Sequence, residues 1–439
     1  MKENELFEKA SIPKAYFTMA LPVVFSMVVS LIYNVVDTYF VAKTQNASLV
    51  AAVSLCAPLF TLMIALGDIF GIGGSSVISR LFGQKKNEEA KNVSSFCLYT
   101  SIVCGLIVSV LMFIFKSPIL NFLGTSKDTL PYAIQYYNYI AIGATFIIVS
   151  LTPSNLIRTE GLATLSMVGT VIGSVVNIVL DPIFIFGLNM GAGGAALATI
   201  LGYLISDIFL LYFTHHKAPR LSISFKDMKV SKKNIKDIIA IGIPASITNI
   251  MASFGQTLCN RYLVSYGTNN VAAMGIALKV NMIILLIMVG FAFGAQPLLG
   301  FNYGAGNKER LKKLIQFDLM VEIVFALCTA ILLALFAQSI VRIFMQDPDI
   351  VAIGTKMLRW LIVTGPFVGI ILVFSTLFQS EGKGIPALIL SIARQGVVYA
   401  IVIFIASKLF GFQGILASQA LSDTITMCLA LLIYKFDKS

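Results

Sequence analysis

The stretch Val176-Asn-Ile-Val-Leu-Asp-Pro-Ile-Phe184 places an amide and a carboxylate four residues apart inside an apolar run. That run, residues 167–187, is long enough to cross a bilayer as a helix. Asn177 and Asp181 share one helix face at this spacing, and hydrocarbon offers the acid no water. Pro182 follows directly, removing a backbone donor and favouring a kink beside the acid. An acid, an amide and a helix break at one membrane depth predict a proton or cation site.

The composition of the chain is that of a membrane protein. Of its 439 residues 57% are hydrophobic and 12% are charged, whereas soluble domains carry about 25% charged residues. A polytopic membrane protein is therefore expected, and not an enzyme. The net charge of +11 then reflects lysine and arginine on the cytoplasmic side and not nucleic-acid binding. The six cysteines lack metal-ligand spacing and the sequence has no Gly-x-x-x-x-Gly-Lys-Ser/Thr loop, so we expect no cofactor and no ATP.

Twelve apolar runs of about 20 residues or more predict an all-α membrane protein with twelve transmembrane helices. Lysine and arginine are concentrated in the N-terminal segment and the even-numbered connections, which predicts that both termini are cytoplasmic. The expected spans are 14–41, 49–79, 92–115, 131–154, 162–187, 191–214, 237–265, 270–300, 312–337, 353–378, 384–408 and 412–434.

The two halves of the chain repeat each other. Ala20-Leu-Pro22 matches Gly242-Ile-Pro244, and Arg158-Thr-Glu-Gly161 matches Gln379-Ser-Glu-Gly382, at offsets of 222 and 221 residues. Because six spans is an even number, both halves run the same way, as two pseudo-symmetric six-helix lobes with a substrate path between or within them. The predicted units are an N-lobe at 1–214, a basic cytoplasmic linker at 215–236 and a C-lobe at 237–439.

Six polar side chains on four predicted N-lobe helices fall at one depth, roughly 6–15 Å below the outer helix ends. Such a set binds a small cation through oxygen ligands, or holds a proton on a desolvated carboxyl beside a second acid. The alternative is a set of unrelated residues near headgroup water. At the repeat positions the C-lobe has no acid, so the site is predicted in the N-lobe only. The six are Tyr33, Asp37, Tyr136, Asn177, Asp181 and Thr199.

Other polar and adaptable side chains are weaker candidates. Arg394 lies in the middle of a span, where it either faces a wet cavity or pairs with Asp423 or Glu322, and pairing is the favoured interpretation. Asp68 either joins a cytoplasmic gate or marks a solvated helix end. Methionine repacks around varied ligands, so one stretch of the eighth span could line a drug cavity, although core or lipid-facing packing is the commoner role. The residues concerned are Met282, Met288, Phe291 and Gln296.

The ordered motifs resemble the multidrug and toxic compound extrusion (MATE) transporters over nearly the whole chain. The resemblance implies that the six residues above form the family's N-lobe cation site and that Pro22 is the proline about which the first helix bends. Acids that some members carry on the seventh and tenth helices are missing, which argues against a C-lobe sodium site of that kind. The motifs are Ala20-Leu-Pro22, Tyr33 with Asp37-Thr-Tyr-Phe40, the glycines of 67–74, Asn177 to Pro182, and Gly193-Gly-Ala-Ala196.

This resemblance implies a secondary active antiporter in the bacterial cytoplasmic membrane. It would export amphipathic, often cationic drugs in exchange for H⁺ or Na⁺ held at Asp37 and Asp181, by alternating access and as a monomer. Two other classes stay open. A lipid-linked precursor flippase of the same superfamily would carry several bases in its cavity, whereas a passive channel or structural membrane protein needs no pair of acids.

Overall fold

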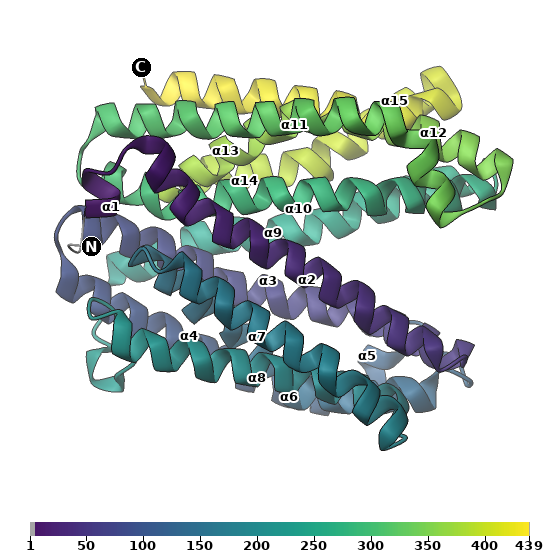
Figure 1. Cartoon of the computed structure of the whole chain (residues 1–439), viewed down its shortest axis with the longest axis horizontal. Coiled ribbons are helices and arrows are strands. Elements are labelled where there is room, and N and C mark those ends of the chain that lie inside the picture. Colours follow the sequence, from purple (N-terminus) through teal and green to yellow (C-terminus); the bar gives the residue numbers. More distant parts are fainter. Residues whose placement is uncertain (1–4, 439) are drawn as a thin grey trace.

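The structure is a computed structural model that describes residues 5–438, and it consists almost entirely of long helices lying side by side (Figure 1). The prediction of an all-α membrane fold is confirmed. The helices of the first half are α1 (Glu5–Glu8), α2 (Ile12–Lys43), α3 (Ala47–Gly83), α4 (Asn87–Ile114), α5 (Lys116–Phe122), α6 (Leu130–Thr159), α7 (Ala163–Pro182), the π-helix η1 (Ile183–Gly187) and α8 (Gly191–Lys217). After the 3₁₀-helix η2 (Phe225–Asp227) come α9 (Lys232–Val264), α10 (Thr268–Gly304), α11 (Lys308–Phe344), α12 (Pro348–Val363), α13 (Gly365–Glu381), α14 (Gly384–Ile392), the π-helix η3 (Ala393–Val397) and α15 (Val398–Lys438).

The described helices provide twelve membrane spans. Ten stretches are long and apolar enough to cross a bilayer, and the bent pair α12–α13 makes an eleventh. The last of the ten, Gly384–Asp437, has 54 residues, about 80 Å as one helix, whereas a bilayer core is about 30 Å thick. Gly411 breaks it with a φ of +55°, and Gly414 lies directly against the Ala406 carbonyl, so the chain turns back there. This stretch is therefore two spans.

Helix α2 crosses between the two halves of the molecule (Figure 1). Its N-terminal half, which the topology predicted from the sequence makes the inner part, packs on α10, where Gly294 and Gly290 let the backbone of Ala20 and Val24 come close. Its C-terminal part, the outer part in that topology, packs on the α7–η1 segment, with the rings of Phe40 and Phe186 6.5 Å apart. Each glycine is needed because a Cβ there would collide with main-chain atoms.

Helix α9 makes the complementary crossing. Near its start Gly242 packs on the backbone of Ile69 in α3, and farther along Gly255 packs on Gln395 in η3. The first helix of each half therefore contacts the other half at one end and its own half at the opposite end. Counting spans along the sequence did not predict this exchange.

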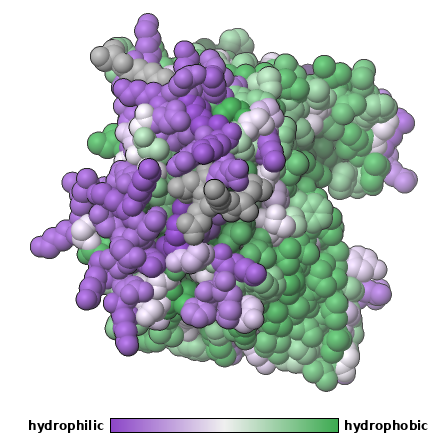
Figure 2. All heavy atoms as spheres, turned by 60° about the vertical axis from the view of Figure 1, so that its left-hand side comes forward, coloured by the Kyte–Doolittle hydropathy of each residue, from purple (hydrophilic) through white to green (hydrophobic). Residues whose placement is uncertain are grey.

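Hydrophilic side chains are concentrated at one end of the molecule, and an apolar girdle follows it. The described start of the chain at α1 and the end of α15 lie together at the left of Figure 1. Hydrophilic side chains gather at this end in Figure 2, and apolar side chains cover most of the rest in two masses with an indentation between them, with a few hydrophilic side chains at the far edge of each mass. Ile331 and Leu335 of α11, which are 61% and 71% exposed, belong to the apolar surface that faces lipid in a membrane protein.

Candidate ion-binding site

The end of α7 brings Asn177 and Asp181 into the interior. Both side chains are buried, with Asp181 0% exposed. Pro182 lacks an N–H, and the chain passes into the π-helix η1 directly after it, where the Leu188 N–H donates to the Ile183 carbonyl at 2.8 Å. A π-helical turn is a rare irregularity that marks functional sites more often than ordinary helix does. The predicted break beside the acid therefore takes the form of a change in helix type.

The carboxyl groups of Asp37 and Asp181 face each other between α2 and α7. They lie within hydrogen-bonding reach of one another. Both oxygens of Asp181 and Oδ1 of Asp37 have no donor among the described residues. Leaving a buried anion without a partner costs several kcal/mol. The pair is therefore suited to share a proton or to bind a cation, since either removes the repulsion between two charges.

Hydroxyl and amide groups complete the shell around the two acids. Asn177 Nδ2 donates to Thr199 Oγ1 at 3.2 Å, and that hydroxyl donates to the Ala195 carbonyl at 3.0 Å. Asn177 Oδ1 has no donor in the part of the chain that the structure describes, so it is available as a ligand. The Tyr33 hydroxyl lies within reach of Thr199, and Tyr136 lies beside both carboxyls. The structure thus brings together all six side chains that the sequence placed at one depth.

Two residues extend this site along α8. Tyr203 lies beside Tyr33 and Tyr136, and Asp207 lies beside Tyr203. The Asp207 side chain is buried, and neither of its oxygens has a partner among residues 5–438. Thr199, Tyr203 and Asp207 follow one another at intervals of four residues, which places them on one helix face. This spacing was the signal in the sequence that could have found the last two.

The drug-cavity candidates on α10 are mostly packed inside the protein in this conformation. Met288, Phe291 and Gln296 are buried, and only Met282 is exposed, at 49%. Phe291 stacks on Tyr16 with ring centroids 6.4 Å apart, and Gln296 Nε2 donates to Gln379 Oε1 at 3.4 Å. These three side chains do not line an open surface here, because the inner part of α2 and helix α13 cover them.

Arg394 forms an ion pair and is not a free cation. Its Nε lies 3.2 Å from Asp423 Oδ1, which also accepts from Gln419 Nε2 at 3.0 Å. Of the two acids that the sequence offered as partners, Asp423 is the one that it contacts. The charge of Arg394 is therefore already matched within the C-terminal half.

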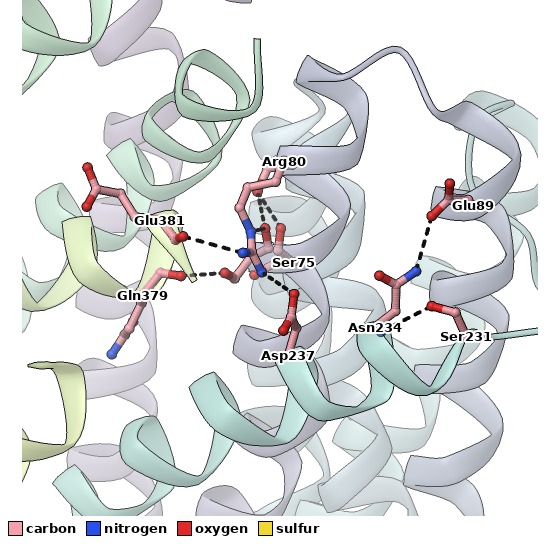
Figure 3. Close-up of polar contacts among 10 residues, drawn as sticks. Ser75, Arg80, Glu89, Ser231, Asn234, Asp237, Gln379 and Glu381 are labelled. Atoms are coloured by element: carbon pink, nitrogen blue, oxygen red, sulfur yellow. Dashed lines mark hydrogen bonds and ion pairs between the residues drawn. The ribbon is translucent and has the colours of Figure 1, made fainter. Parts of the chain in front are cut away.

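The two halves are held together by polar contacts at the end where α1 and the end of α15 lie (Figure 3). Arg80 of α3 is central: its Nη2 lies 3.8 Å from Asp237 Oδ2 in α9, and its Nη1 donates to the Glu381 carbonyl at 3.4 Å. Ser76 donates to the Gln379 carbonyl. We call this set the inner seal, because the topology predicted from the sequence makes this end cytoplasmic. Asp68 lies twelve residues before Arg80 along α3, about 18 Å deeper in the molecule, and accepts a hydrogen bond from Asn249 Nδ2 of α9 at 2.9 Å. It therefore also contacts the other half, and its role in a gate stays a prediction.

Comparison with known proteins gives one family. The MatE family model matches residues 22–183 and 244–405, two stretches whose starts are 222 residues apart. The multidrug export protein MepA of Staphylococcus haemolyticus (strain JCSC1435) is 34% identical, and that of Staphylococcus aureus (strain MSSA476) is 32% identical; each alignment covers 99% of this chain and 96% of the relative.

Solved structures agree in fold over the full length. A crystal structure of MATE in complex with MaL6 and an outward-facing conformation of a multidrug resistance MATE family transporter both superpose with a TM-score of 0.93. Each is 27% identical in sequence and covers 100% of this chain and 98% of the other. With the family model matching most of the chain in both halves, this protein belongs to the MatE family of multidrug and toxic compound extrusion transporters.

Proposed function

We propose that this protein is a multidrug efflux antiporter of the bacterial cytoplasmic membrane, which exports amphipathic, often cationic drugs in exchange for H⁺ or Na⁺ by alternating access. The relatives named as multidrug export proteins support the drug substrate. The observation that carries the coupling is the facing pair Asp37 and Asp181: Asp181 is fully buried and Asp37 partly buried, and three of their four carboxyl oxygens have no donor in the described structure. An antiporter needs such a group, because its charge must change with ion occupancy.

The geometry suggests how occupancy acts on the helices. When the pair is empty, two carboxylates repel each other across the contact between α2 and α7. A proton or Na⁺ removes that repulsion and favours close approach of the two helices. Helix α2 also packs on α10 at its other end, so a change near Asp37 alters the contact between the two halves. Pro22 lies between the two ends of this helix, where a missing backbone hydrogen bond makes bending easier.

The same arrangement makes drug binding and ion binding oppose each other. The inner seal joins the halves at one end, and the carboxyl pair lies toward the opposite end of α2. If ion binding favours a conformation that holds the drug weakly, linkage requires that the drug weakens ion binding by the same factor. Ion entering from outside therefore drives drug release to the outside.

The test is efflux from sealed proteoliposomes of a fluorescent cationic dye, with a pH gradient and a Na⁺ gradient imposed separately. We expect one gradient to drive efflux by the native protein, and Asp37→Asn or Asp181→Asn to abolish the gradient-driven part. Asp349→Asn, which changes an exposed aspartate at the start of α12, is the matched control and should behave like the native protein. Unchanged efflux in both site variants, at equal amounts of inserted protein, would falsify the proposal.

A further inference from the structure

Two further carboxylates lie buried on α11, far from the site described above. Asp318 and Glu322 are one helical turn apart, and both are 0% exposed. The Tyr16 hydroxyl of α2 donates to Asp318 Oδ1 at 2.7 Å. The other three carboxyl oxygens have no partner within residues 5–438. Glu322 is therefore an acid without a side-chain partner, enclosed entirely by protein.

The residues around the two acids supply no positive charge. The inner part of α2 contributes Tyr16, helix α10 contributes Phe291 and the backbone of Ala292, and α13 contributes Gly369, which lies against the side chain of Glu322. The titratable groups that act on one another here are the two acids and Tyr16. The described part of the chain places no lysine, arginine or histidine in contact with either acid.

These surroundings favour bound protons over two ionised groups. Each unpaired buried anion costs several kcal/mol, and two on adjacent turns of one helix also repel each other. A permanently neutral, purely structural pair is the simpler alternative. It explains little, because every unsatisfied buried polar group costs about 1–3 kcal/mol and an apolar side chain of the same size avoids that cost. If the two acids gain and lose a proton during the transport cycle, their function explains why two carboxyl groups are buried here.

The position of the pair ties it to the movement of α2. Tyr16 and Asp37 are 21 residues apart on this helix, which places about 30 Å between the two carboxyl sites. The inner part of α2 covers Asp318 and Glu322, and its aromatic side chains pack around them: the ring of Tyr16 lies 5.2 Å from that of Phe317. If this part of α2 moves off α11, water reaches both carboxyls.

We propose that Asp318 and Glu322 form a second proton-binding site, occupied while Tyr16 is docked on Asp318 and emptied when the inner part of α2 leaves α11. The proton passes from the carboxyl to water at the inner end of the molecule, the carboxylate becomes hydrated, and Tyr16 keeps its own proton. Protonation therefore favours the docked state, and raising the pH on the inner side favours undocking. This goes beyond the proposed function, because it concerns the inner end of α2 and not the Asp37 site.

Amide hydrogen exchange of the purified protein in lipid nanodiscs measures docking directly. The probes are the amides of residues 12–22 and 314–322, with rates corrected for the intrinsic effect of pH. If undocking releases one proton, the corrected opening constant rises by up to about tenfold per pH unit, and by up to about a hundredfold for two protons. We expect this rise in the native protein and a flat profile in Asp318→Asn/Glu322→Gln, whose amides imitate the protonated acids in size and charge.

Three variants distinguish the proposal from its alternatives. Thr329→Val removes a hydroxyl two turns farther along α11 and should keep the native pH profile. Asp37→Asn should also keep it, even where it abolishes drug efflux, so failure of the efflux mechanism and failure of this inference are separable. Should the double variant not fold, Glu322→Gln alone is expected to lower the slope. A native profile that is flat, or a slope that Glu322→Gln leaves unchanged, would show that the acids have only a structural role.

Discussion

Gly304→Ala tests whether the inner seal depends on close backbone contact between the two halves. A Cβ at Gly304 would collide with the carbonyl of Arg80 in α3, and these are main-chain atoms that cannot rotate away. Helices α3 and α10 must then separate at this point. Overpacking of this kind costs about 1–3 kcal/mol. Since the cost falls only on the state in which the halves touch here, the ratio of closed to open inner ends should fall by roughly 5- to 150-fold.

The assay is hydrogen exchange of the amides at 76–83 and 298–304, which should become faster in Gly304→Ala by that factor. Gly275→Ala is the matched control on the same helix, because nothing lies within 4 Å of a Cβ there. Replacing glycine by alanine inside a helix is itself favourable by up to about 1 kcal/mol, so the control should exchange no faster than the native protein. Equal protection of the two variants at the inner ends would refute the argument that this contact is a tight, state-dependent one.

Two further substitutions test the ion site and the Arg394 pair. Thr199→Val removes the acceptor of Asn177 and a hydroxyl near Tyr33. The loss of one hydrogen bond of about 0.5–1.5 kcal/mol should weaken ion binding by roughly 2- to 10-fold. The measurement is the ion concentration that gives half-maximal efflux. Arg394→Leu leaves Asp423 buried without a counter-charge, so the melting temperature should fall by an amount equivalent to about 3–5 kcal/mol, and the double variant Arg394→Leu/Asp423→Leu should recover most of it. If Arg394→Leu melts like the native protein but loses drug binding, the arginine belongs to the drug cavity instead.

The membrane spans and the meeting of the two acids could be predicted from the sequence because both follow from distances along single helices. Hydrophobic length gives the spans, and 1.5 Å per residue gives the depth of Asp37 and Asp181. Even the turn at Gly411, which separates the last two spans, falls in the gap between two predicted apolar runs.

Lateral packing could not be predicted in this way. Nothing in the spacing of Met288 or Phe291 says whether α2 covers them, because that depends on the crossing of α2 between the halves. Asp318 and Glu322 show the same limit: the repeat offset leads to the C-lobe positions of the N-lobe acids, and the pair on α11 stands at neither of them. Comparing equivalent positions of the two halves therefore finds only sites whose residues occur in both halves.

The two crossing helices differ in a way that bears on the mechanism. In α2 both ends contact carboxyl groups: Asp37 faces Asp181 near the outer end, and Tyr16 donates to Asp318 near the inner end. In α9 the position equivalent to Asp37 is Cys259, which lies within reach of Tyr399, and the position equivalent to Tyr16 is Ile238, which packs on Gly73. A change in protonation therefore alters the contacts of α2 at both ends and leaves these contacts of α9 unchanged. It follows that ion-driven rearrangement should begin in α2, with α9 responding to it through the inner seal.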